Sequence, residues 1–252
     1  MIVKTEADLE GLKKIGKIVA NCLQHMARSM EPGMTTKELD EIGGKFLELH
    51  GARSGPMLTY NFPGYNCISL NHEVAHGVPS NKKIQKGDLI NIDVSAELNG
   101  YYADNGGSFI VQPPGRSEDQ RLLDATRKAL NAAIAAVKAQ ELINVIGYNI
   151  EKVAKEHGYT VIENLGSHGV GRGLHEEPKF IASYFDKADK RRLKEGHVIT
   201  IEPFLSTGAR FVDEEPDNWT LVAGKEHRTA QFEHTMVVMK DRALIVTHPD
   251  PV

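Results

Sequence analysis

The chain has 252 residues, of which 40% are hydrophobic and 25% charged, as is ordinary for a soluble globular protein. Its net charge of −4 gives no electrostatic reason to expect DNA or an anionic membrane as a partner. The two cysteines, Cys22 and Cys67, are too few for a disulfide framework. We find no signal peptide and no apolar run near the ~18–20 residues of a membrane span. The sequence therefore predicts a cytoplasmic protein.

The first part of the chain predicts two helices followed by three strands. Apolar residues recur at helical spacing in the first helix, and Thr35 with Glu38 forms a capping-box pattern at the start of the second. The last two strands alternate in the β manner around Asn99-Gly100, the strongest short hairpin signal. The expected helices are 6–30 and 35–51, and the expected strands are 67–70, 88–98 and 101–111.

The remainder of the chain repeats this order. Ser117 with Gln120 forms another capping-box pattern, which starts an Ala-rich helix of about 20 residues. The charged run from Lys187 to Lys194 predicts a surface helix. Two similar halves are expected, in an α+β fold with a mainly antiparallel sheet and helices packed on one face. The other expected elements are a helix at 144–157 and strands at 159–163, 168–172, 197–206, 219–222, 229–239 and 243–247.

Four acidic residues lie in strand-like sequence, three of them in apolar runs. An ionised carboxylate removed from water is very costly unless it is paired or binds a metal. In the predicted hairpin, Asp93 opposes Gly106, and Asp104 lies two positions away on the same face, so the two acids can share one site. For Glu202 or Glu233 alone, an acid satisfied by an arginine or by backbone amides is an open alternative.

Two histidines flank a glycine-rich segment. His168 and His175 are separated by a stretch with Gly169, Gly171 and Gly173, which suggests a backbone that passes very close to another group. Two imidazoles held there could serve as one ligand and one acid/base group. Four acids and one imidazole suit a pair of hard or borderline divalent ions. The predicted ligand set is Asp93, Asp104, His168, Glu202 and Glu233.

A competing motif occurs in the first half. His72-Glu73-Val74-Ala75-His76 matches H-E-x-x-H, the zinc metalloprotease signature, which works only on a helix. Gly77 and Pro79 follow closely and argue against an ordinary helix. His76 alone is weak evidence for a site, and Trp219, the only tryptophan, fits a core or a pocket lid equally well. The basic run around Lys190 could contact ribosomal RNA, although such runs are more often solvated.

Five short motifs occur in a fixed order along the chain. They are Asn91-Ile92-Asp93, Tyr102-Ala103-Asp104, His168-Gly169-Val170-Gly171 with His175-Glu176-Glu177-Pro178, Thr200-Ile201-Glu202-Pro203, and Ala230-Gln231-Phe232-Glu233-His234-Thr235. Together they resemble type I methionine aminopeptidase over essentially the whole chain. The family's pita-bread fold has two pseudo-symmetric halves, which agrees with the repeated order of elements. The resemblance implies a single catalytic metallopeptidase domain over residues 1–252.

The resemblance also implies a role for each matched residue. Asp93 would chelate one divalent ion, His168 and Glu202 would hold a second, and Asp104 and Glu233 would bridge both. The two ions, which could be Co, Mn, Fe or Zn, would lower the pKa of a bridging water. The catalytic roles fall on Glu202 as proton acceptor, His175 as the group that stabilises the oxyanion, and His76 as the contact to the scissile amide nitrogen.

The implied substrate is the N-terminal methionine of nascent proteins whose second residue is small and uncharged. By position, the methionine pocket would be lined by Thr59, Tyr60, Phe62, Cys67, Leu174 and Trp219, with His76 and His175 also touching substrate. The chain departs from the family where Leu174 replaces a usual Phe, Tyr60 a frequent His and Asn105 a usual Thr. The implied state is a monomer, with transient ribosome contact as a further expectation.

Three alternatives stay open. An X-Pro aminopeptidase or prolidase shares the fold and the ligand types, but such enzymes usually carry a large extra N-terminal domain, and only 75 residues precede His76. A non-enzymatic binding protein on the same fold is disfavoured, because such relatives lose ligands and all five are present here. A zincin built on the H-E-x-x-H match is the third alternative.

Overall fold

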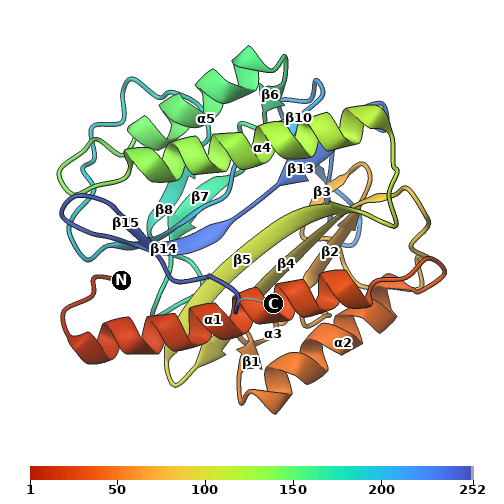
Figure 1. Cartoon of the computed structure of the whole chain (residues 1–252), viewed down its shortest axis with the longest axis horizontal. Coiled ribbons are helices and arrows are strands. Elements are labelled where there is room, and N and C mark those ends of the chain that lie inside the picture. Colours follow the sequence, from red (N-terminus) through yellow and green to blue (C-terminus); the bar gives the residue numbers. More distant parts are fainter. Residues whose placement is uncertain (251–252) are drawn as a thin grey trace.

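The computed structural model describes residues 1–250 and contains helices and antiparallel strands in two related halves. In Figure 1, α1 crosses the strands below and α4 crosses them above. The helices are α1 (Glu6–Ser29), α2 (Thr36–Leu49), α3 (Gly55–Tyr60), α4 (Ser117–Ala136) and α5 (Val145–Glu156). The strands of the first half are β1 (Arg53–Ser54), β2 (Cys67–Leu70), β3 (Glu73–Ala75), β4 (Leu89–Leu98) and β5 (Tyr101–Ile110).

In the part of the second half that the structure describes there are ten strands, all shorter than β4 and β5. They are β6 (Thr160–Val161), β7 (Gly166–Gly169), β8 (Glu176–Ala182), β9 (Val198–Ile201), β10 (Phe204–Ser206), β11 (Asp213–Glu214), β12 (Leu221–Val222), β13 (Thr229–Gln231), β14 (His234–Val238) and β15 (Ala243–Ile245). Five of them form the sheet β15-β14-β9-β7-β8, which supports most of the candidate site. Within residues 1–250, no helix has both the length and the apolar character needed to cross a bilayer.

The first half is held by two capped helices over a long hairpin. Thr35 and Glu38 form the predicted capping box of α2, and Thr5 with Asp8 forms a second one that starts α1. The apolar face of α1 packs on β4 and β5, in one core that also includes residues of β2. Its buried residues include Leu12, Ile15, Val19, Leu23 and Met26. The predicted strand at 67–70 and the two long hairpin strands are confirmed.

The register of the β4–β5 hairpin follows from its two-residue turn. Asn99 and Gly100 have φ values of 53° and 80°, as a tight primed turn requires. Asp93 therefore pairs with Gly106, and Ser95 pairs with Asp104. Because side chains alternate along a strand, the two aspartates project from the same face, as predicted.

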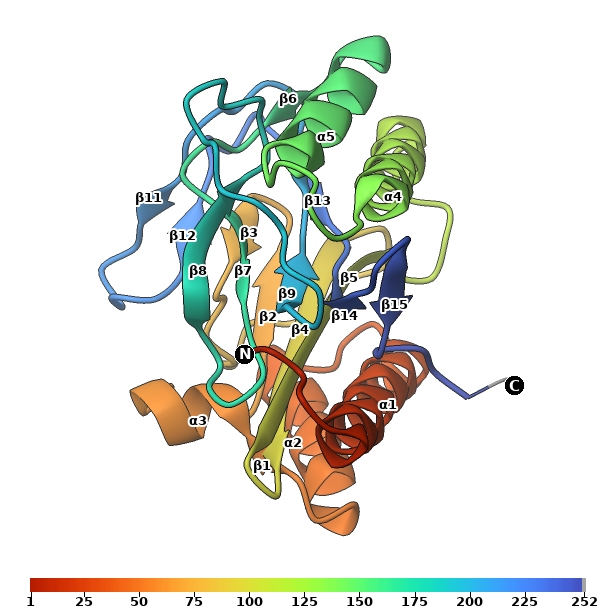
Figure 2. The same cartoon turned by 90° about the vertical axis from the view of Figure 1, so that its left-hand side faces the viewer.

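The second half repeats the arrangement with α4 and α5, which pack on their own strands in a separate core. Figure 2 shows α1, α4 and α5 on one side of the strands, with β8, β11, β12 and α3 on the other. The helices thus pack mainly on one face, and the opposite face is free to form a cavity.

The two halves meet along β5. Gly107 forms an isolated bridge with Phe232, and the amide of Glu233 donates to the carbonyl of Gly106 with an N–O distance of 3.0 Å. The Thr235 hydroxyl accepts from the amide of Asp104 at 2.9 Å and donates to its carbonyl at 2.8 Å. These bonds fix the acidic residues of one half against those of the other.

Two local predictions are wrong. The run from Lys187 to Lys194 is not a helix, because its only leucine, Leu193, is fully buried and its backbone bonds the turn before α5. Ser117 does not cap α4, since Arg116 holds the N-cap position and no side chain bonds there. No local sequence signal marks α3, β3 or β8, because these elements are short or polar.

Candidate metal centre

The five predicted ligands come from three strands and two short connections. Asp93 lies on β4, Asp104 on β5 and His168 on β7, while Glu202 follows β9 and Glu233 links β13 to β14. Four of them are less than a tenth exposed, and Asp93 is partly buried. Residues that are 140 positions apart in the chain therefore occupy one buried cluster.

Their donor atoms lie close together. Nε2 of His168 is 3.4 Å from Oε1 of Glu202 and 3.8 Å from Oδ2 of Asp104. One donor atom each from Asp104, His168 and Glu233 lie within 4.8 Å of one another. Asp93 shares a cavity with Asp104, His168 and Glu202. The structure thus brings the whole predicted set together.

The four carboxylates of this cluster are buried or partly buried, repel one another and, in the described part of the chain, have no positively charged side chain beside them. Burial raises the pKa of Asp93, and raises the pKa values of Asp104, Glu202 and Glu233 well above the usual range, with neighbouring carboxylates adding to the last three. In residues 1–250, no lysine or arginine forms an ion pair with any of them. Oδ1 of Asp104 and Oε1 of Glu233 are buried without a hydrogen-bond partner. Divalent cations fit this donor set, because they supply the missing charge and satisfy the unpaired oxygens.

His168 is prepared to be a ligand. Burial lowers the pKa of His168 to about 3, so its imidazole is neutral near pH 7. Nδ1 of His168 lies 2.9 Å from the carbonyl oxygen of Gly169, which can only accept, so this nitrogen carries the hydrogen. Nε2, which faces Glu202 and Asp104, is left with a free lone pair.

Hydroxyl and amide groups behind the ligands hold them in place. The hydroxyl of Thr200 accepts from the amide of His168 at 3.1 Å and donates to Oε1 of Glu202 at 3.2 Å. Ser167 uses its hydroxyl to accept from the amide of Glu202 at 3.0 Å. Nε2 of Gln231 donates to Oε2 of Glu233 at 3.1 Å. Such supporting bonds orient ligands and reduce their freedom to rotate.

A cavity of about 370 Å³ opens beside the cluster. Five of the six residues predicted for the methionine pocket line it: Tyr60, Phe62, Cys67, Leu174 and Trp219. Thr59 does not, because α3 turns Tyr60 into the cavity and leaves Thr59 exposed. Phe62 and Trp219 meet edge to face with ring centroids 5.2 Å apart, so part of the wall is aromatic.

His76 and His175 both reach this cavity. Burial lowers the pKa of His175 to about 4 and also lowers the pKa of His76, so both imidazoles are neutral at pH 7. The rings of His168 and His175 have centroids 4.1 Å apart. The Tyr60 hydroxyl lies 2.7 Å from Nδ1 of His175, a contact that the sequence did not predict.

Further cavity residues were also missed. Lys179, on the unpredicted strand β8, donates from Nζ to the carbonyl of His175 at 2.8 Å and so fixes the backbone of that loop. Asn105 points away from the cavity and lines a second hollow of about 220 Å³ with Glu233. The other cavity residues not singled out are Pro56, Ala75, Ser95, Asn164, Leu165, Gly166, Phe180 and Phe204. No local pattern marks these side chains, since they meet only in the folded chain.

The H-E-x-x-H match does not form a metal site. Glu73–Ala75 is strand β3, so His72 and His76 do not lie one helical turn apart. Glu73 instead forms an ion pair with Lys82 and accepts from the amide of Leu70 at 2.9 Å. The zincin alternative is therefore wrong.

The fold and the site together define a class, the metal-dependent hydrolases built on two pseudo-symmetric halves. The sequence model of metallopeptidase family M24 matches residues 10–240. A methionine aminopeptidase of Staphylococcus epidermidis is 46% identical over 99% of this chain and 100% of that protein. The crystal structure of methionine aminopeptidase from Rickettsia prowazekii has a TM-score of 0.93 at 34% identity, with 98% of this chain and 100% of that chain covered.

The prolidase from Pyrococcus furiosus shares the fold less closely. It has a TM-score of 0.79 at 25% identity, and the match covers 99% of this chain and 66% of the prolidase. The chain belongs to metallopeptidase family M24, and its close relatives in that family are methionine aminopeptidases. It therefore has the pita-bread fold, and family membership implies that it binds divalent metal.

Proposed function

We propose that this chain is a metal-dependent aminopeptidase that removes the N-terminal methionine of peptides whose second residue is small and uncharged. The observation that carries the proposal is the cluster of four carboxylates and one neutral imidazole beside an aromatic-walled cavity. Both halves contribute ligands, which supports a single catalytic domain over residues 1–252.

We infer that the cluster holds two divalent ions, with Asp104 and Glu233 shared between them. Each of these residues has a buried carboxylate oxygen without a hydrogen-bond partner, which suits a bridging ligand. Bound divalent ions would lower the pKa of a water molecule enough to provide hydroxide near neutral pH. Co, Mn, Fe and Zn all suit a set of carboxylate and imidazole donors, so cellular supply would decide the native ion.

The residues around the cluster would direct the attack on the first peptide bond. Glu202 is positioned to accept a proton, because its carboxylate lies among the ligands and borders the cavity. The Tyr60 hydroxyl can donate to Nδ1 of neutral His175, which places the ring hydrogen on Nε2. That hydrogen can then stabilise the oxyanion, a contribution of ~10²–10³ in rate. His76 would donate to the departing amide nitrogen.

The cavity wall supports methionine as the first residue. A flexible thioether packs favourably against aromatic rings, and Tyr60, Phe62 and Trp219 provide them. Leu174 and the buried thiol of Cys67 complete an apolar lining. The X-Pro aminopeptidase alternative has less support, since the prolidase matches with lower identity and extends well beyond this chain.

We infer that the natural substrates are new protein chains in the cytoplasm and that the enzyme acts as a monomer without DNA or membrane partners. The basic run gives limited support for ribosome contact, because Arg191 is paired with Asp189 and Arg192 donates to a backbone carbonyl. Salt-dependent sedimentation with ribosomes would test that expectation.

Peptide hydrolysis tests the proposed function. Purified protein loaded with Mn²⁺ should release methionine from Met-Ala-Ser, should act poorly on Met-Leu-Ser, and should lose activity after chelation. Readdition of Mn²⁺ should restore it. Equal activity in the chelated protein, or preference for an Xaa-Pro peptide over Met-Ala-Ser, would contradict the proposal.

A further inference from the structure

One wall of the cavity is built from two segments that are distant in sequence. His76 follows β3, Trp219 precedes β12, and both residues line the cavity. His76 has a φ of 53°, in the left-handed region that non-glycine residues seldom adopt. A strained backbone of this kind persists only where its surroundings hold it in place.

The chain on the N-terminal side of His76 is held by the segment that follows Trp219. Strand β3 pairs with β12, with Ala75 opposite Leu221. The amide of Ala223 also donates to the carbonyl of His72 at 3.0 Å. The short strand β12 therefore holds the backbone that leads into His76 from its N-terminal side.

Gly77 is held just as firmly on the C-terminal side. Its amide donates to the hydroxyl of Ser69 at 3.1 Å, and its carbonyl accepts from the amide of Ile68 at 2.9 Å. A methyl group on Gly77 would come within 2.2 Å of the Ile68 carbonyl oxygen, so only glycine fits there. Both bonds come from the first half of the chain.

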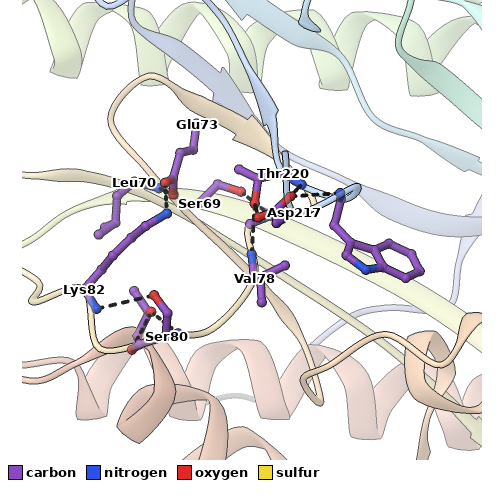
Figure 3. Close-up of polar contacts among 11 residues, drawn as sticks. Ser69, Leu70, Glu73, Val78, Ser80, Lys82, Asp217 and Thr220 are labelled. Carbon is purple, nitrogen blue, oxygen red and sulfur yellow. Dashed lines mark hydrogen bonds and ion pairs between the residues drawn. The ribbon is translucent and has the colours of Figure 1, made fainter. Parts of the chain in front are cut away.

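A chain of hydrogen bonds, called here the polar relay, connects Val78 to Thr220 and Asp217, as Figure 3 shows. The amide of Val78 donates to Oγ1 of Thr220 at 3.3 Å, and that hydroxyl lies 2.6 Å from Oδ2 of Asp217. Oδ1 of Asp217 accepts from the amides of Trp219 at 2.9 Å and Thr220 at 2.8 Å. An ionised carboxylate can only accept, so Thr220 donates to Asp217 and keeps its lone pairs for Val78.

We propose that Asp217 and Thr220 are positioning residues that fix His76 relative to Trp219, and so set the distance between the amide-contacting imidazole and the methionine pocket wall. Asp217 shapes the turn that carries Trp219, while Thr220 transmits that position to the segment carrying His76. Thr220 is 1% exposed, so water does not readily replace its hydroxyl in the relay. The proposal rests on the proposed function only for its catalytic consequence.

The two residues should have separable effects. Thr220→Val removes the hydroxyl at nearly constant volume, so kcat on Met-Ala-Ser should fall about 10–100-fold with little change in KM, as expected for a slight misplacement of a reacting group. Thr220→Ser keeps the hydroxyl and should restore kcat. Asp217→Ala frees the turn as well, so it should lower kcat and also raise KM.

A readout that needs no metal and no substrate is available, because Trp219 is the only tryptophan. In the metal-free protein, Asp217→Ala should increase acrylamide quenching of Trp219 fluorescence. Thr126→Val is the matched control, since it removes a buried hydroxyl that donates to the Leu122 carbonyl within α4, away from the cavity. It should change neither quenching nor kcat.

The proposal is overturned if Thr220→Val keeps the wild-type kcat, or if Thr220→Ser loses as much as Thr220→Val. Unchanged Trp219 quenching in Asp217→Ala would also overturn it. Asp217 is exposed, so this variant is expected to fold even where a change at Thr220 prevents folding. A wild-type protein that fails to cleave Met-Ala-Ser would contradict the proposed function instead. The quenching comparison would still test whether Asp217 holds the turn that carries Trp219.

Discussion

Oδ2 of Asp104 lies 3.8 Å from Nε2 of His168, although the two residues come from different halves of the chain. Asp104 is fixed by the hydroxyl of Thr235, which also belongs to the second half. The site is therefore complete only when the halves dock. Mutations that loosen the junction should reduce metal affinity even where they touch no ligand.

Glu233→Gln should have opposite effects on activity and on the stability of the metal-free protein. Loss of a ligand should reduce turnover by more than about 100-fold. This is more than the loss of about 10–100-fold that is typical when only a group supporting a ligand is altered. In the presence of chelator near pH 7.5, the free energy of unfolding of the variant should be about 1–3 kcal/mol higher than that of wild type. The substitution removes one buried acid from a cluster of mutually repelling carboxylates.

The sign of the pH effect follows from the raised pKa of Glu233. An acid whose pKa is raised by folding gives up stability as the pH rises through that pKa, so the advantage of Gln should grow from pH 5 to pH 8. Denaturant unfolding at several pH values measures it. A metal-free variant less stable than wild type at pH 7.5 would show that the carboxylate is satisfied without metal.

Arg228 and Asp119 form a buried ion pair that ties α4 to the start of β13. Two nitrogens of Arg228 donate to the two oxygens of Asp119 at 3.0 and 2.9 Å, and Asp119 is fully buried. Asp119→Ala should lower the free energy of unfolding by about 3–5 kcal/mol, since it leaves a buried guanidinium unpaired. Urea denaturation checks this. Arg210→Ala, at the exposed pair with Glu163, should cost under about 1 kcal/mol.

Tyr60→Phe should lower kcat about 10-fold with metal binding intact. The hydroxyl of Tyr60 sets the tautomer of His175, and without it the ring hydrogen can move to Nδ1. The phenyl ring still lines the pocket, so KM should change little. Steady-state kinetics and metal titration give the comparison, and a variant with unchanged kcat would remove Tyr60 from the mechanism.

Cys22 should make the protein sensitive to alkali. Burial in α1 raises the pKa of its thiol to about 12. A group whose folded pKa is raised contributes stability below its unfolded pKa and loses it as the pH increases, here from about pH 9 upward. Wild type should therefore lose up to ~1.4 kcal/mol per pH unit more than Cys22→Ala between pH 9.5 and 11. If the free energies of unfolding of the two proteins fell equally with pH over that range, this account would be contradicted.

The elements that could be predicted are those whose signals are local. The Asn99-Gly100 turn fixed the register that places Asp93 and Asp104 on one face, and the Thr35–Glu38 box fixed the start of α2. The prediction for Lys187–Lys194 was wrong because a run of charged residues resembles a solvated helix. In the structure, the buried side chain of Leu193 determines the conformation of this segment.

The part of the site that escaped prediction depends on contacts between distant segments. Thr59 was expected in the pocket, but the six-residue helix α3 leaves it in solvent, and Tyr60, although also exposed, borders the cavity. Lys179 reaches the cavity from β8, whose polar sequence carries no strand signal. The Asp217–Thr220–Val78 relay likewise joins residues about 140 positions apart through one hydroxyl.

Anomalous scattering from Mn²⁺-soaked crystals tests the central claim most directly. We predict two peaks at the edge of the cavity, with Asp104 and Glu233 touching both, Asp93 touching one, and His168 and Glu202 touching the other. Peaks elsewhere, for example at His72 and His76, or an empty cluster with its carboxylates turned apart, would contradict the account.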